Sequence, residues 1–177
     1  MNSYAPFLAE LTRFYLGFIL LAAAWGKSRT YTYFLSQLTV SFLIPPAASR
    51  VLAPCILLLE WALALSILAT GNSVAIALAG ALFTLFSLVL LQRYISQGTV
   101  KCSCFGETDR PVTDYDLLRN GWLVAVFPAC FWLNDTAFAT ALSLQLLAAA
   151  LAVLLTLITV NFSDIMLQLF DVAEAGR

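Results

Sequence analysis

The run Val74-Ala-Ile-Ala-Leu-Ala-Gly-Ala-Leu-Phe-Thr-Leu-Phe-Ser-Leu-Val-Leu-Leu91 decides the fold of this chain, because it contains no charged residue. A helix needs about 20 apolar residues to cross a hydrocarbon core of about 30 Å, and the segment 74–93 meets that length. A second charge-free run begins at Ala137 and continues to residue 162. Both runs predict membrane-spanning helices.

The rest of the chain has the same character. Of its 177 residues 62% are hydrophobic and 11% are charged, and the mean hydropathy is +0.90. Three further apolar stretches, at 6–26, 50–70 and 114–133, are long enough to span a bilayer. We therefore expect an all-α integral membrane protein, a single transmembrane helical domain over 1–177 with about five spans. The short connections 71–73 and 134–136 predict that the helices on either side of each are antiparallel neighbours.

Composition also excludes several classes of function. The net charge of −1 gives no basis for a nucleic-acid partner. The chain has no histidine, which excludes a histidine general base, an imidazole ligand for zinc or haem, and a Ser-His or Cys-His pair. The four cysteines are then the evident source of redox or soft-metal chemistry.

Two connections between the spans are longer than the others. Residues 27–49 carry aromatic and leucine side chains followed by Pro45-Pro46, and we expect an interfacial amphipathic segment lying across the mouth of the bundle. Residues 94–113 hold two cysteines. With five spans both connections lie on the same side of the membrane, so the chemistry is expected on that face.

The motif Lys101-Cys-Ser-Cys-Phe-Gly106 is the main candidate site. Two thiols separated by one residue, Cys102 and Cys104, suit dithiol–disulfide exchange. The neighbouring Lys101 would favour the reactive thiolate. A bridge across one residue is strained and therefore easily reduced, as suits a catalytic disulfide. The alternatives are a structural disulfide, idle thiols, or a copper(I) site, since two thiolates can satisfy that soft ion. We expect no other metal.

Charged residues inside the spans form the second group of candidates. Glu60 lies deep in the second span, where a carboxylate is expensive unless it is protonated or paired. It is interpreted either as a proton relay or as the partner of Arg13 in an intramembrane ion pair, and the two roles are compatible. Cys55 is interpreted either as an auxiliary redox thiol or as a small core residue. Cys130 is interpreted as a core residue.

Three tryptophans, Trp25, Trp61 and Trp122, could line a quinone pocket near the cysteine loop. The alternative is an interfacial aromatic belt, where tryptophan is common in membrane proteins.

These residues together resemble a known family. Arg13, Ala23-Ala-Trp-Gly-Lys27, Glu60-Trp61, Cys102-Ser-Cys-Phe-Gly106 and Arg119-Asn120 follow in the order typical of the methylamine utilisation protein MauE family, related to DoxX-type membrane proteins. The resemblance covers roughly residues 10–125. It implies a four-helix bundle core plus an added C-terminal helix, DsbB/VKOR-like in general architecture, in the bacterial inner membrane.

The resemblance also implies a function. The protein would be a thiol–disulfide oxidoreductase that supports maturation of the small, tryptophan tryptophylquinone-bearing subunit of methylamine dehydrogenase. Its partners would be a periplasmic thioredoxin-like carrier or the client itself, and by analogy a membrane quinone would accept the electrons. Arg119 and Asn120 would support the loop. The alternative is a non-catalytic assembly factor or a copper(I)-handling protein.

The sidedness of the cysteine loop is a point of conflict. The positive-inside rule places its face in the cytoplasm, where thiols are kept reduced. The resemblance and the sulfur chemistry favour the periplasm, and we expect the loop there. The cations on this face are Lys27, Arg29, Arg50, Arg93, Lys101, Arg110, Arg119 and Arg177.

Overall fold

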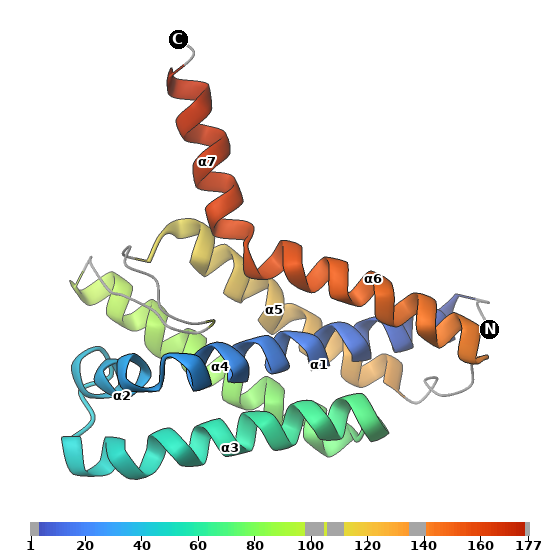
Figure 1. Cartoon of the computed structure of the whole chain (residues 1–177), viewed down its shortest axis with the longest axis horizontal. Helices are drawn as coiled ribbons and strands as arrows, with labels where there is room; N and C mark the ends of the chain where they lie inside the picture. The colour runs from blue at the N-terminus through green and yellow to red at the C-terminus, as the bar shows by residue number, and fades with distance from the viewer. Residues whose placement is uncertain (1–3, 98–104, 106–111, 135–140, 176–177) are drawn as a thin grey trace.

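The computed structural model describes residues 4–97, 105, 112–134 and 141–175. Every regular element in these parts is an α-helix (Figure 1). In chain order the helices are α1 (Ala5–Arg29), α2 (Tyr31–Val40), α3 (Pro46–Thr70), α4 (Ser73–Gln97), α5 (Asp114–Leu133), α6 (Leu142–Val160) and α7 (Phe162–Ala175). The predictions that concern Lys101, Cys102 and Cys104 lie outside the described residues.

Four helices, α1, α3, α4 and α6, are long and apolar enough to cross a membrane. The chain is therefore a multi-pass, all-α membrane protein, as the sequence predicts. The remaining expected span, 114–133, is the helix α5, but its length and composition do not place it among these four. Its first two turns contain Asp114, Asp116 and Arg119, which lower its mean hydropathy.

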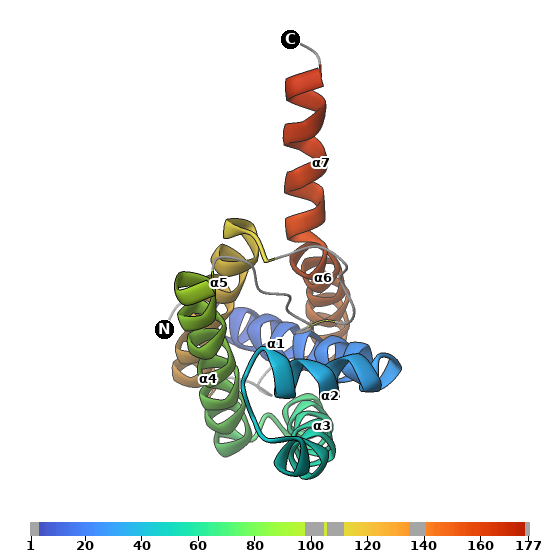
Figure 2. The same ribbon diagram turned by 90° about the vertical axis from the view of Figure 1, so that its left-hand side faces the viewer.

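The helix α1 forms the centre of the bundle. It packs most extensively against α6 and α3 and also contacts α5, while α4 packs against α5 and α3 (Figures 1 and 2). The core between these helices includes Leu16, Ile19, Ile67 and Leu123, all fully buried. The prediction that 114–133 and 137–162 pack side by side is wrong, because α6 lies chiefly on α1. A short connection fixes only where a helix starts, and the larger apolar contact decides where it packs.

The connection 27–49, expected to be an interfacial amphipathic segment, contains a helix. Its middle part is the helix α2, whose Phe34 and Leu38 are buried against Ala53 near the start of α3. The helix α3 begins at Pro46 rather than near residue 50. A proline is favourable in the first turn of a helix, where its missing N–H has no intrahelical acceptor.

One end of the bundle collects most of the non-spanning structure. The end of α1, the helix α2, the end of α4, the start of α5 and the α6–α7 junction all lie there, and the N-terminus lies at the other end (Figure 1). We call this end the loop face, because both ends of the 98–111 connection lie on it. The two long connections share one side, as the sequence predicts.

Candidate functional site

The described residue nearest the cysteine motif in sequence is Phe105, which follows Cys104 directly. Phe105 is half-buried and packs against the main core cluster. The guanidinium carbon of Arg119 on α5 lies 4.7 Å from the centroid of the Phe105 ring, a cation–π contact. Arg119, predicted to support the loop, therefore contacts it at Phe105.

The start of α5 is a compact polar cluster. The side chain of Asp116 accepts hydrogen bonds from both the backbone N–H and the hydroxyl of Thr113, each at 2.9 Å, so a capping box starts α5. The other carboxylate oxygen accepts a 2.7 Å bond from Ser163 at the start of α7. Arg119 lies 3.5 Å from Asp116 and donates to the Val160 carbonyl oxygen at 3.3 Å. These contacts join α5, α6 and α7 at the loop face.

Two buried side chains in this cluster have unused hydrogen-bonding groups. Among the described residues the Nε of Arg119 has no hydrogen-bond partner, and neither the nitrogen nor the oxygen of the Asn120 amide has one. Asn120, the other residue predicted to support the loop, is fully buried within the bundle. Buried polar groups are normally satisfied, so these atoms mark a place where a water molecule or a ligand would be stabilised.

Glu60 forms a buried ion pair, but with Lys27 rather than with Arg13. The Lys27 ammonium donates to Glu60 Oε1, and the two side chains are only 6% and 5% exposed. The ammonium also lies 5.6 Å from the ring centroid of Phe34 and 5.4 Å from that of Phe86. This one cation therefore connects α1 with α2, α3 and α4. The second oxygen of Glu60 has no hydrogen-bond partner within the described part of the chain.

The predicted Arg13–Glu60 pair is wrong for a geometric reason. Arg13 and Lys27 are separated on α1 by roughly 21 Å at 1.5 Å per residue. Because α1 and α3 are antiparallel, the middle of α3 faces the C-terminal half of α1, where Lys27 lies. Arg13 instead meets the last turn of α3.

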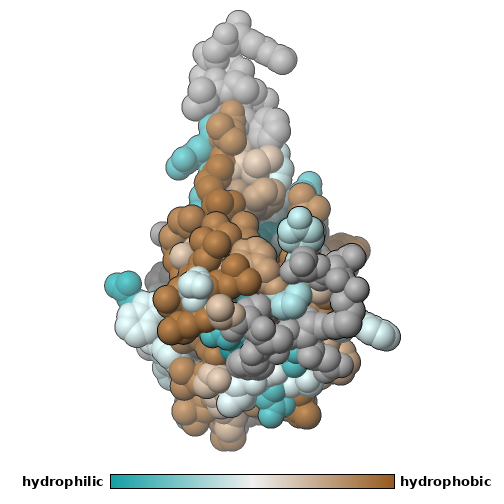
Figure 3. Space-filling model, turned by 90° about the vertical axis from the view of Figure 1, so that its right-hand side faces the viewer, coloured by the Kyte–Doolittle hydropathy of each residue, from teal (hydrophilic) through white to brown (hydrophobic). Residues whose placement is uncertain are grey.

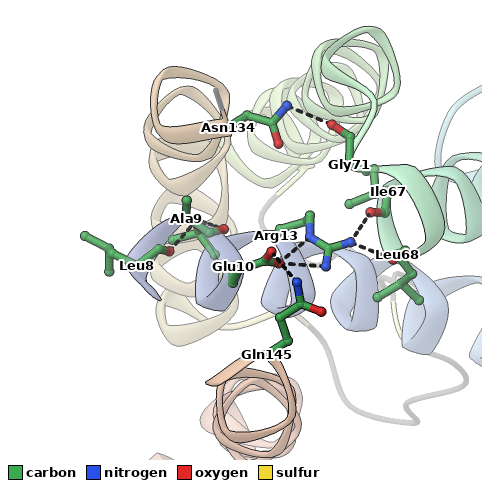
Figure 4. Close-up of polar contacts among 10 residues, drawn as sticks. Leu8, Ala9, Glu10, Arg13, Ile67, Leu68, Gly71, Asn134 and Gln145 are labelled. Carbon is green, nitrogen blue, oxygen red and sulfur yellow. Dashed lines mark hydrogen bonds and ion pairs between the residues drawn. The ribbon is translucent and has the colours of Figure 1, made fainter. Parts of the chain in front are cut away.

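At that far end of the bundle Arg13 belongs to a different cluster (Figure 4). It pairs with Glu10, whose Oε2 accepts from the guanidinium Nε at 2.8 Å and lies 2.7 Å from a terminal guanidinium nitrogen. It also donates to the carbonyl oxygens of Ile67 at 3.2 Å and Leu68 at 2.6 Å. Gln145 of α6 donates to Glu10 at 3.4 Å. The guanidinium thus ties α1 to the last turn of α3, a structural role, although the Ile67 carbonyl oxygen also accepts the N–H of Gly71 at 3.0 Å. Glu10 is not among the residues predicted from the sequence, although its i, i+3 spacing from Arg13 indicates the pair.

The three tryptophans predicted for a quinone pocket do not gather in one place. Trp25 and Trp61 meet edge to face with ring centroids 6.4 Å apart, and the Trp61 indole donates to Ser28 at 3.2 Å. Trp122 belongs to α5, is 60% exposed, and lines a half-open cavity of about 350 Å³. The cavity is otherwise lined by Leu118, Arg119, Ile158, Thr159 and Phe162. Its walls are almost entirely apolar, with the guanidinium and one hydroxyl as polar groups.

The two cysteines within the described parts of the chain are both free thiols. Cys55 is exposed on the surface of α3, and Cys130 is buried in the main core cluster. Among the described residues no three side chains of the metal-binding types lie close enough together to hold an ion.

Fold and site define a helical membrane protein with charged and polar clusters at both ends of its bundle. Comparison with protein families then assigns it. Residues 5–134 match the family model of the methylamine utilisation protein MauE, and the chain belongs to that family. No curated protein and no solved structure matches the chain.

Proposed function

We propose that this protein is a membrane thiol–disulfide oxidoreductase that supports the maturation of an enzyme of methylamine utilisation. The observation that carries the proposal is the Cys102-Ser103-Cys104 motif next to Phe105, the residue that Arg119 contacts at the loop face. The client suggested by the family is the small subunit of methylamine dehydrogenase. The membrane is the bacterial inner membrane, with the loop on the periplasmic side.

In the exchange step a disulfide is transferred from the loop to the client. A disulfide between Cys102 and Cys104 is attacked by a thiolate of the client or of a thioredoxin-like carrier, which forms a mixed disulfide. The second thiol of the client then displaces the loop cysteine. The client gains one disulfide and loses two electrons and two protons. Cys102 and Cys104 take up these electrons and protons and become two thiols.

Reoxidation of the pair needs an acceptor of two electrons and two protons. A membrane quinone would supply that chemistry, and among the described residues the cavity beside Trp122 and Arg119 suits it. Its walls are apolar, its volume of about 350 Å³ admits a ring, and Arg119 and Thr159 offer hydrogen-bonding groups. Trp25 and Trp61, which lie elsewhere, are then aromatic anchors rather than pocket walls.

A cell-based experiment separates this function from its alternatives. A strain lacking the protein would be complemented with the wild type, with Cys102→Ser/Cys104→Ser, or with Cys55→Ser/Cys130→Ser as the matched control. The measurements are growth on methylamine and the number of disulfides in the dehydrogenase small subunit. We expect the first variant to fail and the control to match the wild type.

Full complementation by Cys102→Ser/Cys104→Ser would reject the redox function and favour a non-catalytic assembly factor. Failure of that variant accompanied by normal client disulfides and lost copper(I) binding would favour the copper-handling alternative. Failure of the Cys55→Ser/Cys130→Ser control would identify one of these two thiols as a further participant, and the single variants would show which.

A further inference from the structure

The helix α7 leaves the bundle in a direction unlike that of the spans. It begins two residues after the end of α6, with Asn161 at the turn, and runs across the common direction of α1, α3, α4 and α6 (Figure 1). Viewed toward the loop face, α7 extends well beyond the outline of the other helices (Figure 2). Its contacts with the bundle are with α5 and α6, at its root.

Among the described helices, α7 has the clearest division between an apolar side and a polar side. Phe162, Ile165, Met166 and Leu169 recur at helical spacing, and Val172 and Ala173 continue the same stripe in the sequence. The opposite side of the helix carries Asp164 and Gln168, with Asp171 following in the sequence. Ile165 is 41% exposed and Leu169 is 62% exposed.

The apolar stripe of α7 is visible from the end of the bundle opposite the loop face. Figure 3 views the molecule from the end opposite the loop face and shows a hydrophobic strip that continues from the spans onto α7. The apolar side of α7 is thus continuous with the surface that the spans present to lipid. A helix that projected into water would leave this apolar strip exposed, which is unfavourable.

We propose that α7 is an interfacial helix that lies on the membrane surface at the loop face, with its apolar stripe in the boundary between headgroups and acyl chains. The occupant of the stripe is the bilayer itself. Segment 162–175 contains three acidic residues and neither lysine nor arginine. Its binding therefore rests on apolar burial and not on attraction to anionic lipids.

This placement fixes the depth of the polar cluster at the start of α5. Ser163, the second residue of α7, donates to Asp116, and Arg119 donates to Val160 just before the turn. If α7 lies at headgroup level, these contacts hold the first turns of α5 at the same level. That position explains why α5 begins with charged residues although the rest of it is apolar.

Spin labelling of the full-length protein in lipid nanodiscs tests the proposal. Single cysteines would replace Ile165 and Leu169 on the apolar side, and Asp164 and Gln168 on the polar side, in a chain whose four native cysteines are serine. The readout is the ratio of collisions with oxygen, which concentrates in lipid, to collisions with a water-soluble nickel chelate. Because activity is not measured, the outcome is independent of the proposed redox function.

We expect a severalfold higher ratio at 165 and 169 than at 164 and 168, in zwitterionic and in anionic discs alike. Equal access of the chelate to all four positions would place α7 in water and overturn the proposal. Labels at 165 and 169 that are shielded from both reagents would indicate a protein partner or a second copy, which would also overturn it. A ratio that rises only with anionic lipid would contradict the role given to apolar burial.

Discussion

At the scale of single residues, the ion pair of Lys27 and Glu60 is the most consequential contact in the bundle. Both groups are buried, and the lysine also faces the rings of Phe34 and Phe86. Removing one member of a buried pair leaves an uncompensated charge in a medium of low dielectric constant, whereas removing both members leaves none. The pair is therefore expected to behave as a unit.

We predict that Lys27→Leu alone destabilises the protein by about 3–5 kcal/mol, the usual loss when a buried pair is broken from one side. The double variant Lys27→Leu/Glu60→Leu should lose clearly less. Arg29→Leu, which removes an exposed cation from the end of the same helix, is the control and should have little effect. Thermal unfolding in detergent measures all three, and equal losses in the single and double variants would show that the two residues do not act together.

The sequence could indicate that Glu60 has a partner but not which one. An intramembrane carboxylate requires compensation, and that much follows from its position in an apolar run. The choice between Arg13 and Lys27 depends on how far α1 and α3 are offset along their axes and on how deep a long lysine side chain reaches. Glu10 is different, because its spacing from Arg13 is a local signal and could have been used.

At the scale of elements, α1 and α3 approach closely at Gly17. A Cβ atom added at Gly17 would lie 2.5 Å from a methyl carbon of Leu68, whereas one added at Gly121 would meet nothing within 4 Å. Small residues allow such close packing between membrane helices.

We predict opposite effects of the same substitution at these two glycines. Gly121→Ala should be neutral or stabilise by up to about 1 kcal/mol, because alanine is the better helix former. Gly17→Ala should destabilise by about 1–3 kcal/mol, because Leu68 must move within a packed core. Unfolding temperatures in detergent compare the two, and a Gly17→Ala protein as stable as Gly121→Ala would mean that α1 and α3 are not in close contact there.

The contact between Ser163 and Asp116 is the second test at this scale. Ser163 is 1% exposed, and its hydroxyl joins the root of α7 to the start of α5. Ser163→Ala should cost about 1–3 kcal/mol because a buried hydrogen bond to the Asp116 carboxylate is lost. Ser143→Ala, at an exposed position of α6, should be close to neutral. Unfolding in detergent is measured for both variants, and equal stability of Ser163→Ala and Ser143→Ala would contradict the contact between Ser163 and Asp116.

The positions of the elements were largely predictable, whereas their packing was not. Apolar length placed four spanning helices within a few residues, since it reflects a property of the segment alone. The neighbours of α6 were wrong because they depend on which apolar faces fit, and α7 was not predicted at all. Its apolar residues are too few for a span, although their helical spacing was there to be used.

For the molecule as a whole, the structure weakens the argument from the positive-inside rule that the loop face lies in the cytoplasm. Two of the cations on the loop face are buried and paired, Lys27 with Glu60 and Arg119 with Asp116. They no longer count as free positive charges in a connecting segment. Among the described residues Arg29, Arg50 and Arg93 still favour the cytoplasm for this face.

We predict that the loop cysteines react from outside the cell. Intact cells would be mildly reduced and then treated with a membrane-impermeant maleimide, in a chain with Cys55→Ser and Cys130→Ser. Labelling before lysis is expected, since the disulfide-forming role requires the periplasm. Labelling that occurs only after lysis would place the loop in the cytoplasm and would exclude disulfide donation to a periplasmic client.

The most direct test of the central claim is the redox state of Cys102 and Cys104 in the purified Cys55→Ser/Cys130→Ser protein. Free thiols would be alkylated before and after exposure to dithiothreitol of increasing concentration, and the added groups would be counted by mass. We predict no alkylation before reduction and two added groups after mild reduction, because a disulfide across one residue is easily opened. If both thiols are alkylated without reductant, and remain open to alkylation in a sample first treated with a mild oxidant, the proposed redox function is contradicted.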